Sequence, residues 1–277
     1  MSVGSQAPEG DGHWHRVLDE KSYDEAALFT PENLLREARR QKSLPDLPVP
    51  EIVLLDPDGD IVRYLAASGT GRRHSGWACY HTDMWVTDLN GIEVGVVGAA
   101  VGAPFAVLVA EQLAVSGAGL VISITSAGLI CPTDQPPYFV LIRHALRDEG
   151  TSRHYLPPAV WSSLPASLAT RLATAYADLD EPVHDGSSWT TDAPYRETRS
   201  TVAAACDAGI SCVEMEAAAL YAYATARGRD VVCLAHITNV MATAGDDFEK
   251  GEANGVPAAL AVAHATAAAW LTGRPAG

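Results

Sequence analysis

The sequence predicts an α/β fold, a single-domain three-layer α/β/α sandwich around a mixed, mostly parallel twisted sheet. Short apolar runs, such as residues 120–125 and 231–237, are typical of strands that are buried on both faces. These runs alternate along the chain with longer segments of helical pattern, which favours parallel strands joined by helices. The chain has 277 residues, of which 48% are hydrophobic and 7% aromatic. That composition supports one sizeable core built mostly from Ala, Val and Leu.

The N-terminal residues are predicted to form a tail, a helix and a linker ahead of the main domain. Residues 31–41 have the boundary signals of a helix, because Thr30 can cap it, Pro31 suits its first turn and basic residues fill its last turn. A proline-rich linker follows at residues 45–50. The predicted division of the chain is 1–49 for tail, helix and linker, 50–272 for the domain and 273–277 for a C-terminal tail.

The first half of the domain is predicted to contain a hairpin between two strand–helix units. Asn90-Gly91 is a dipeptide that favours the tight turn of a hairpin, and Gly102 precedes a helix that starts with Pro104. In chain order the predicted elements are a strand at 51–56, a turn at 57–60, a helix through Arg63 to Leu65, a flexible loop at 69–76, hairpin strands at 84–87 and 92–98, and a helix from Pro104 to about Ser116.

The second half is predicted to alternate between strands and helices. Gly209 ends one helix, and the apolar run after it leads directly into Glu214. The predicted strands are at 120–125, 138–142, 182–184, 209–213 and 231–237, and the predicted helices are at 159–178, 194–208, 216–227 and the C-terminus.

The charge balance argues against one class of partner. Lys and Arg number 19 against 34 Asp and Glu, which gives a formal net charge of −15. Proteins that bind nucleic acid polymers concentrate basic residues on the binding surface, so we expect no such partner.

Cysteine usage and hydropathy predict a soluble cytoplasmic protein. The five cysteines are odd in number and scattered, without C-x-x-C spacing, so we expect reduced thiols rather than a disulfide framework or a zinc site. The N-terminal residues lack the apolar core of a signal peptide. The weakly polar helix near residues 256–270 is interrupted by His264 and is too short for a membrane span, so we expect no membrane partner.

Two carboxylates that flank a methionine give the strongest functional signal. Alternate side chains of an extended segment lie on one side, so Glu214 and Glu216 can face a common cavity while Met215 faces away. A helix that starts at Glu216 favours the ionised form of that carboxylate. Two acids beside a core-forming segment need partners, and a ligand rich in hydroxyls is one. The alternative is a solvated strand end beside a helix N-terminus.

Residues 213–220 (VEMEAAAL) resemble the V-E-M-E-x-A-x-L signature of the purine nucleoside and uridine phosphorylase superfamily, which also contains methylthioadenosine and S-adenosylhomocysteine nucleosidases. Four further stretches follow the order of that family. Residues 54–63 resemble its first strand with the phosphate loop, and residues 102–104 resemble its glycine–proline helix start. Residues 123–128 resemble its R-x-G-[ST]-x-G strand end, and residues 238–248 resemble its last strand with a D-F segment. The resemblance identifies the domain at 50–272 as nucleoside phosphorylase-like.

This resemblance implies cleavage of the N-glycosidic bond of a nucleoside through an oxocarbenium-like sugar that phosphate or water attacks. It places Glu214, Met215 and Glu216 at the ribose, with Glu216 also catalytic. A carboxylate can accept hydrogen bonds from both vicinal hydroxyls of the sugar, and its charge supports the developing positive charge.

The resemblance also implies a phosphate subsite at Gly59, Arg63 and Ser126. The Arg63 guanidinium offers a fork of donors beside the backbone N–H groups of the Gly59 turn. The alternative for Arg63 is an ordinary exposed helix arginine, and the alternative for Ser126 is a plain strand exit.

Ala127, Gly128, Tyr195 and Asn239 are the implied contacts of the base. Small residues let a ligand approach the backbone. Asn239, the second catalytic candidate, stands where purine-cleaving relatives carry a proton-donating Asp, and an amide cannot give up a proton in that way. A pyrimidine, an oxopurine or a modified base is compatible with it. The alternative interpretation of Tyr195 is an aromatic side chain in the core or at a helix start. The alternative interpretation of Asn239 is a capping residue at the end of a strand.

Two of the three phosphate arginines of the family are missing, because Ser123 and Val86 stand at their positions. Losing charge-assisted donors weakens the binding of a dianion by roughly several kcal/mol unless other residues replace them. Arg72, Arg73 or Arg143 are the candidates for replacement.

Phosphorolysis, which gives free base and pentose-1-phosphate, is the first functional hypothesis. Phosphate would be the co-substrate, and no other cofactor is implied. A nucleosidase that uses water is the second hypothesis, because of Ser123 and Val86, and a non-catalytic nucleoside-binding protein is the third. The nine histidines show no paired metal spacing, so we expect no metal. The resemblance also implies a homo-oligomer, from dimer or trimer to hexamer.

Overall fold

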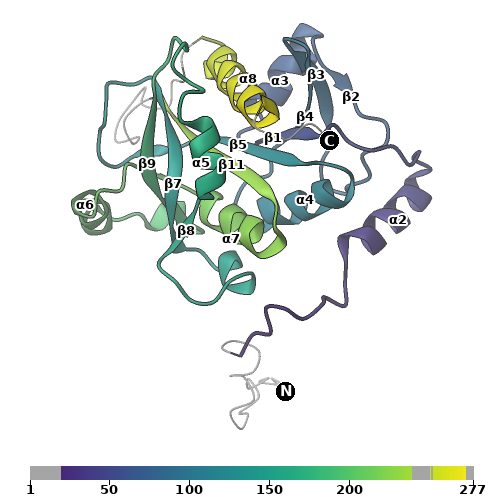
Figure 1. Cartoon of the computed structure of the whole chain (residues 1–277), viewed down its shortest axis with the longest axis horizontal. Coiled ribbons are helices and arrows are strands. Elements are labelled where there is room, and N and C mark those ends of the chain that lie inside the picture. Colours follow the sequence, from purple (N-terminus) through teal and green to yellow (C-terminus); the bar gives the residue numbers. More distant parts are fainter. Residues whose placement is uncertain (1–19, 239–249, 251, 273–277) are drawn as a thin grey trace, which may run out of the picture.

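The structure is a computed structural model that describes residues 20–238, 250 and 252–272. One mixed sheet lies between two layers of helices (Figure 1), so the predicted three-layer α/β class is confirmed. The strand order is β2-β3-β4-β1-β5-β11-β7-β9-β10-β6, and β8 pairs with β7 outside this path. Two blocks of parallel strands, β4-β1-β5-β11 and β7-β9-β10, meet at the antiparallel pair β11-β7.

The strands alternate with the helices along most of the chain, as predicted. They are β1 Ile52–Asp56, β2 Arg72–Arg73, β3 Trp85–Leu89, β4 Ile92–Gly98, β5 Leu120–Ser126, β6 Gly128–Leu129, β7 Tyr138–Asp148, β8 Trp161–Ser163, β9 Val183–Thr191, β10 Cys212–Glu214 and β11 Asp230–Ile237.

The helices form two groups on opposite faces of the sheet (Figure 1). On one face lie α3 (Asp60–Ser68), α5 (Ala166–Leu172) and α8 (Val256–Thr272). On the other lie α4 (Ala103–Val115) and α7 (Ala217–Arg227), with α2 (Pro31–Lys42) packed outside α4. The helix α6 (Arg199–Asp207) packs at the β10–β6 end of the sheet through Ala205 and Val213.

Local sequence signals explain the elements that were predicted closely. The Thr30 hydroxyl accepts from the N–H of Asn33 and caps α2. Asn90 and Gly91 have φ of 52° and 89°, which is the backbone that a tight hairpin turn requires. The central strands β1, β5 and β11 consist almost entirely of buried residues, as their apolar runs indicate.

The predicted helix at 159–178 is wrong. Residues 161–163 form β8 against β7, and the helix α5 is short. Pro165 stands directly before α5, and a proline inside a helix removes a backbone hydrogen bond and clashes with the preceding turn.

Three other predicted boundaries differ from the structure. The loop at 69–76 contains the edge strand β2, and the helix at 194–208 is a 3-10 turn (Pro194–Arg196) followed by α6. The short strand at 182–184 continues as β9 to Thr191. Its later residues include buried Ser188 and Thr190, whose hydroxyls bond to a carboxylate that an apolar pattern does not reveal.

The prediction of reduced thiols is wrong for one cysteine pair. Cys131 and Cys206 form a disulfide with their Cα atoms 5.2 Å apart, across a sequence separation of 75 residues. Cys79, Cys212 and Cys233 are free and buried. The fold brings the pair together by packing α6 against the end of the sheet, and sequence spacing does not show that contact.

One helix among the described residues, Glu252–Thr272, is long and apolar enough to cross a membrane by length and composition alone. Its Val262, Ala263 and Trp270 side chains belong to the main core instead. The length and apolar composition of this helix are therefore explained by its packing against β5 and β4 in the core.

Candidate functional site

The candidate site lies at the carboxyl edge of the parallel strands, where open α/β sheets bind ligands. The strand β1 leads into Asp58, β5 ends at Ser126 and β10 ends at Glu214. Ser126 is in register with His236 of β11, and Glu214 is in register with Thr190 of β9. Segments far apart in the sequence thus bring their polar side chains to one edge.

Glu214 is a buried carboxylate that organises the start of α7. Its Oε2 accepts hydrogen bonds from the N–H groups of Glu216 (2.7 Å) and Ala217 (2.6 Å). Its Oε1 accepts from the hydroxyls of Ser188 (2.9 Å) and Thr190 (2.5 Å). All four donors belong to the chain itself, so Glu214 is fully partnered before any ligand binds.

Glu216, the N-cap residue of α7, has one carboxylate oxygen to spare. Its Oε1 accepts from the N–H of Gly102 at 2.7 Å. Its Oε2 is buried and has no hydrogen-bond partner among the described residues. A buried acceptor without a donor is costly, and a sugar hydroxyl is a donor that can satisfy it. The contacts therefore separate the two glutamates, because one holds the helix and the other offers an oxygen.

The two glutamates also differ in how readily they ionise. Burial raises the pKa of both carboxyl groups. For Glu216 the pKa reaches about 8, because burial and the negative charge of Glu214 outweigh the hydrogen bonds from the backbone, of which that from Gly102 is the stronger. The four donors around Glu214 favour its ionised form. We infer that the proton of this pair sits on Glu216 at neutral pH.

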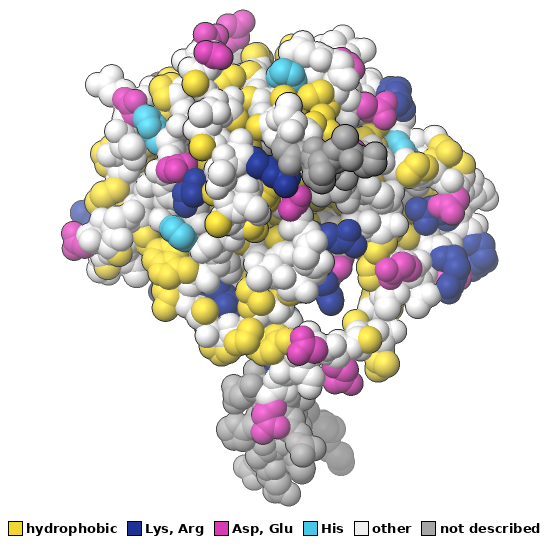
Figure 2. Space-filling view, viewed as in Figure 1, with side chains coloured by type: hydrophobic (Ala, Val, Ile, Leu, Met, Phe, Trp, Pro, Cys, Tyr) yellow, Lys and Arg dark blue, Asp and Glu magenta, His cyan; other side chains and the backbone are white. Residues whose placement is uncertain are grey.

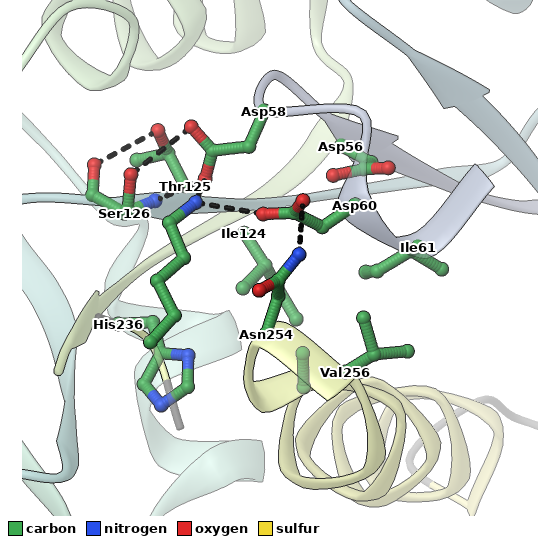
Figure 3. A pocket seen from close by; sticks show the side chains of 12 residues that line it. Asp56, Asp58, Asp60, Ile61, Ile124, Thr125, Ser126, His236, Asn254 and Val256 are labelled. Atoms are coloured by element: carbon green, nitrogen blue, oxygen red, sulfur yellow. Dashed lines mark hydrogen bonds and ion pairs between the residues drawn. The ribbon is translucent and has the colours of Figure 1, made fainter. Parts of the chain in front are cut away.

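Asp58 occupies the donors at the end of β5. The Ser126 N–H donates to Asp58 Oδ2 at 2.8 Å, and the Ser126 hydroxyl donates to Asp58 Oδ1 at 3.0 Å. Figure 3 shows the Asp58 carboxylate directed at Ser126. Asp58 also contributes to the raised pKa of Glu216, which places the two carboxylates within electrostatic reach of each other.

The side chains of Lys250 and Asn254 both bond to Asp60, which follows Asp58 in the same loop. Lys250 Nζ lies 2.7 Å from Asp60 Oδ2 and 3.1 Å from Asp58 Oδ2. The Asn254 amide donates to Asp60 Oδ1 at 3.0 Å (Figure 3). These residues and Ser126 line a cavity of about 20 Å³. A cavity of that size holds about one water molecule.

Gly59 and Arg63 lie together at the same loop, where Gly59 is buried and Arg63 is exposed. Arg63 Nη2 donates to Asp60 Oδ1 at 2.6 Å and to the carbonyl of Asp58 at 2.9 Å. Gly59 has φ of 75°, and Arg63 Nη1 lies 2.8 Å from where a side chain on it would begin. The Arg63 side chain is 66% exposed and does not line the cavity at Ser126.

The three arginines considered as replacements pair with acids elsewhere. Arg72 pairs with Glu93, Arg73 with Asp83, and Arg143 with Asp185. Within the described ranges, Lys250 is the cation that lines the Ser126 cavity.

The residues predicted at the base are only partly brought together. Ala127 and Gly128 follow Ser126 directly and are half-buried, and Gly128 is in register with Val213 beside Glu214. Tyr195, in the 3-10 turn, is 99% exposed. Asn239 lies outside the described residues. Met215 is half-buried between the two buried glutamates.

Sequence reasoning missed Asp58, Asp60, Lys250 and Asn254 as members of the site. The alternating acids of the stretch 56–60 were a signal for the first two. Lys250 and Asn254 carried none, because they lie just ahead of α8 and only the packing of α8 against α3 brings them to this loop. No group of three or more His, Cys, Asp or Glu side chains that could hold a metal ion occurs in the described part of the chain.

Comparisons with known proteins place this geometry in a family. Two curated relatives are nucleoside phosphorylases. A guanosine phosphorylase of Halorubrum lacusprofundi is 27% identical over 139 residues, which are 50% of this chain and 58% of that protein. A uridine phosphorylase of Thermococcus kodakarensis is 28% identical over 220 residues, which are 68% of this chain and 78% of that protein.

Solved structures show the same fold. Two structures of a uridine phosphorylase from Vibrio fischeri, one complexed with 6-hydroxy-1-naphthoic acid, superpose with a TM-score of 0.66. The complex is 19% identical to this chain, and the match covers 82% of this chain and 93% of the other. The second structure is 18% identical, and the match covers 79% of this chain and 91% of the other. The family model described as the phosphorylase superfamily matches residues 51–269. The chain therefore belongs to the phosphorylase superfamily.

Proposed function

We propose that this chain cleaves the N-glycosidic bond of a nucleoside by phosphorolysis and releases a free base and a pentose-1-phosphate. The observation that carries the proposal is the buried, unpartnered Oε2 of Glu216 at the carboxyl edge of the sheet. The names of the curated relatives support phosphate as the nucleophile.

The chemistry follows from the positions of the groups. Glu216 loses its proton as positive charge develops on the sugar, because a nearby positive charge favours the ionised carboxylate. The ionised Glu216 accepts hydrogen bonds from the vicinal hydroxyls of the pentose and stabilises the oxocarbenium-like sugar. Met215 contacts the sugar, and Glu214 keeps the start of α7 in place. Ser126 belongs to the nucleophile subsite, with Ala127 and Gly128 next to the base. Asn239 and Tyr195 remain proposed base contacts, and Gly59 and Arg63 remain proposed phosphate contacts.

Hydrolysis is the second candidate, and one observation favours it. The Asp58 carboxylate already holds both donors of Ser126, and the cavity there has room for about one water. Water would then attack the anomeric carbon in place of phosphate.

One assay distinguishes the two reactions. A panel of purine and pyrimidine nucleosides is incubated with and without phosphate, and base and pentose-1-phosphate are quantified. We expect base release that requires phosphate, with an equal amount of pentose-1-phosphate. Base release at the same rate without phosphate would show hydrolysis. Nucleoside binding by calorimetry without any base release would show a binding protein.

Glu216→Gln tests the ribose contact in the same assay. We expect kcat/KM to fall by about 100-fold or more, because a charge-assisted hydrogen bond to the sugar is lost in the transition state. Glu93→Gln is the matched control, because Glu93 is exposed and pairs with Arg72 away from the site. Equal activity of the two variants would remove Glu216 from the mechanism.

We propose a cytoplasmic location for this enzyme. The three buried free thiols fit a reducing compartment, whereas the Cys131–Cys206 bond argues against one. Cell fractionation with an antibody to the protein tests this, and recovery outside the cytoplasm would overturn it.

A further inference from the structure

The nucleophile subsite is already filled by a carboxylate of the chain. Each Asp58 oxygen accepts one donor of Ser126, the N–H at 2.8 Å and the hydroxyl at 3.0 Å. Two oxygens of a phosphate would accept the same two donors in the same way. The Asp58 carboxylate and a bound phosphate therefore cannot use Ser126 at the same time.

The charges around Ser126 also oppose a second anion. Lys250 is shared between Asp58 and Asp60, and Arg63 pairs with Asp60. The loop carries three aspartates, with Asp56 as the third, so the two cations leave a formal charge of −1. A phosphate dianion that enters this cluster is repelled unless a carboxylate moves away.

The loop itself holds Asp58 in this position. The Asp56 carboxylate accepts from the N–H groups of Gly59 and Val62, both at 3.0 Å, and so fixes the turn on either side of Asp58. The Asp58 side chain is 30% exposed, whereas Asp60 is 11% exposed. Asp58 can therefore leave Ser126 by a change of rotamer toward solvent, without unfolding the loop.

We propose that Asp58 determines how tightly the nucleophile subsite binds phosphate, by competing with phosphate for the two donors of Ser126. This rests on the proposed function, in which Ser126 belongs to that subsite. Phosphate binds after Asp58 has turned away, and the wild-type chain binds phosphate weakly because the competitor is always present. Replacing the carboxylate by a neutral group of the same shape removes the competing charge.

Titration of the full-length protein with inorganic phosphate tests the proposal without any turnover. Isothermal calorimetry measures the Kd of wild type and of Asp58→Asn at the same pH and salt. We expect Asp58→Asn to bind phosphate about tenfold more tightly or better, because charge-assisted hydrogen bonds to Ser126 and Lys250 become available to the ligand. Phosphate affinity that is unchanged, weaker or undetectable in Asp58→Asn overturns the proposal.

Two further variants separate competition at Ser126 from a general effect of charge. Asp60→Asn removes the same charge two residues away, and the Asp60 carboxylate bonds to Lys250, Arg63 and Asn254 rather than to Ser126. A gain in phosphate affinity as large as that of Asp58→Asn would refute specific competition. In the Ser126→Ala background we expect the gain from Asp58→Asn to shrink, because one of the two contested donors is gone. An undiminished gain would also count against the proposal.

Kinetics then connect the subsite to the reaction. In the nucleoside assay we expect the KM for phosphate to fall in Asp58→Asn while the KM for the nucleoside stays within about twofold. If no variant cleaves any nucleoside, the proposed function fails, but the calorimetric result still decides whether Asp58 competes with phosphate. A KM for phosphate that rises in Asp58→Asn contradicts the inference even in an active enzyme.

Discussion

Glu216 combines a buried position with an incomplete set of hydrogen bonds, whereas Glu214, two residues earlier, has a complete set. A carboxylate held in this way is destabilising in the free protein and useful when a ligand supplies the missing donor. We propose that the pair exchanges some stability for a preorganised contact to a sugar.

The ionisation of Glu216 makes stability depend on pH. Its pKa is raised from an ordinary value of 4.5 to about 8, first by burial and then by the charge of Glu214. Between pH 4.5 and about 8 the folded state keeps a proton that the unfolded chain has released, so the free energy of unfolding falls as the pH rises through this window. Glu216→Gln cannot ionise. We therefore expect its Tm relative to wild type to be higher at pH 8 than at pH 5.

Thermal unfolding of both proteins across that range measures the effect. Asp56, whose pKa burial raises to about 6, is present in both proteins and cancels in the difference. A difference in Tm that is the same at pH 5 and pH 8 would show that Glu216 ionises in the folded state at its ordinary pKa.

The junction between β10 and α7 depends on one hydroxyl from β9. The Thr190 hydroxyl donates to Glu214 and accepts from the N–H of Ala218 at 2.9 Å, so it joins a neighbouring strand to the first turn of the helix. Thr190→Val keeps the shape but leaves both groups without this partner. We expect the free energy of unfolding to fall by roughly 2–4 kcal/mol, as measured by urea denaturation.

Thr190→Ser is the matched control, because it keeps the hydroxyl and loses one methyl group. We expect it to cost only about 1 kcal/mol. Equal losses in the two variants would mean that packing of the methyl group, and not the hydrogen bonds, holds this junction.

The start of α4 is the second element that positions Glu216. Gly102 has φ of 87° and ψ of 149°, a conformation in which its N–H reaches Glu216 Oε1. A Cβ there would meet nothing closer than Pro104 Cδ at 4.0 Å, so the cost of Gly102→Ala is backbone strain. We expect a loss of about 1–3 kcal/mol in the free energy of unfolding and a raised KM for the nucleoside.

Gly69→Ala provides the comparison. Gly69 lies at the opposite end of α3 from the Asp60 loop, with φ of 71° and open space around it. We expect a stability cost of about 1–2 kcal/mol with an unchanged KM. If both variants raise the KM equally, the contact between Gly102 and Glu216 does not matter for binding.

At the scale of the molecule, large apolar side chains in two segments are exposed to solvent. Leu28, Phe29 and Tyr195 are 102%, 72% and 99% exposed. The segment ahead of α2 crosses below the body of the domain (Figure 1) and bonds to it through the side chains of Lys21 and Tyr23. Figure 2 shows an opening between part of this segment and the packed surface. Apolar side chains on such a segment are better buried against another chain.

We therefore propose that the protein is a homo-oligomer. Light scattering after size exclusion should give a mass that is two, three or six times 29.2 kDa. A single species of 29.2 kDa at micromolar concentration would contradict this proposal.

The sequence alone determined the elements whose signals are local. The apolar runs predicted β1, β5 and β11, the Asn90-Gly91 dipeptide predicted the hairpin, and residues 213–220 predicted the family and the buried pair of glutamates. Each depends on neighbours within a few residues, and side-chain pattern and backbone preference act over that distance.

The tertiary structure decided which groups face one another. The predicted helix at 159–178 was wrong because residues 161–163 pair with β7 as the strand β8. The predicted strand at 182–184 was too short because the polar residues that continue β9 are buried through hydrogen bonds from Ser188 and Thr190 to Glu214. The contact of Asp58 with Ser126 spans 68 residues, and that of Lys250 with Asp60 spans 190. Such pairs arise from packing between distant segments, and no local pattern in one sequence encodes them. The sequence therefore predicted a ribose-binding carboxylate, and only the fold decided that a second carboxylate, Asp58, bonds to Ser126, where we propose that the nucleophile binds.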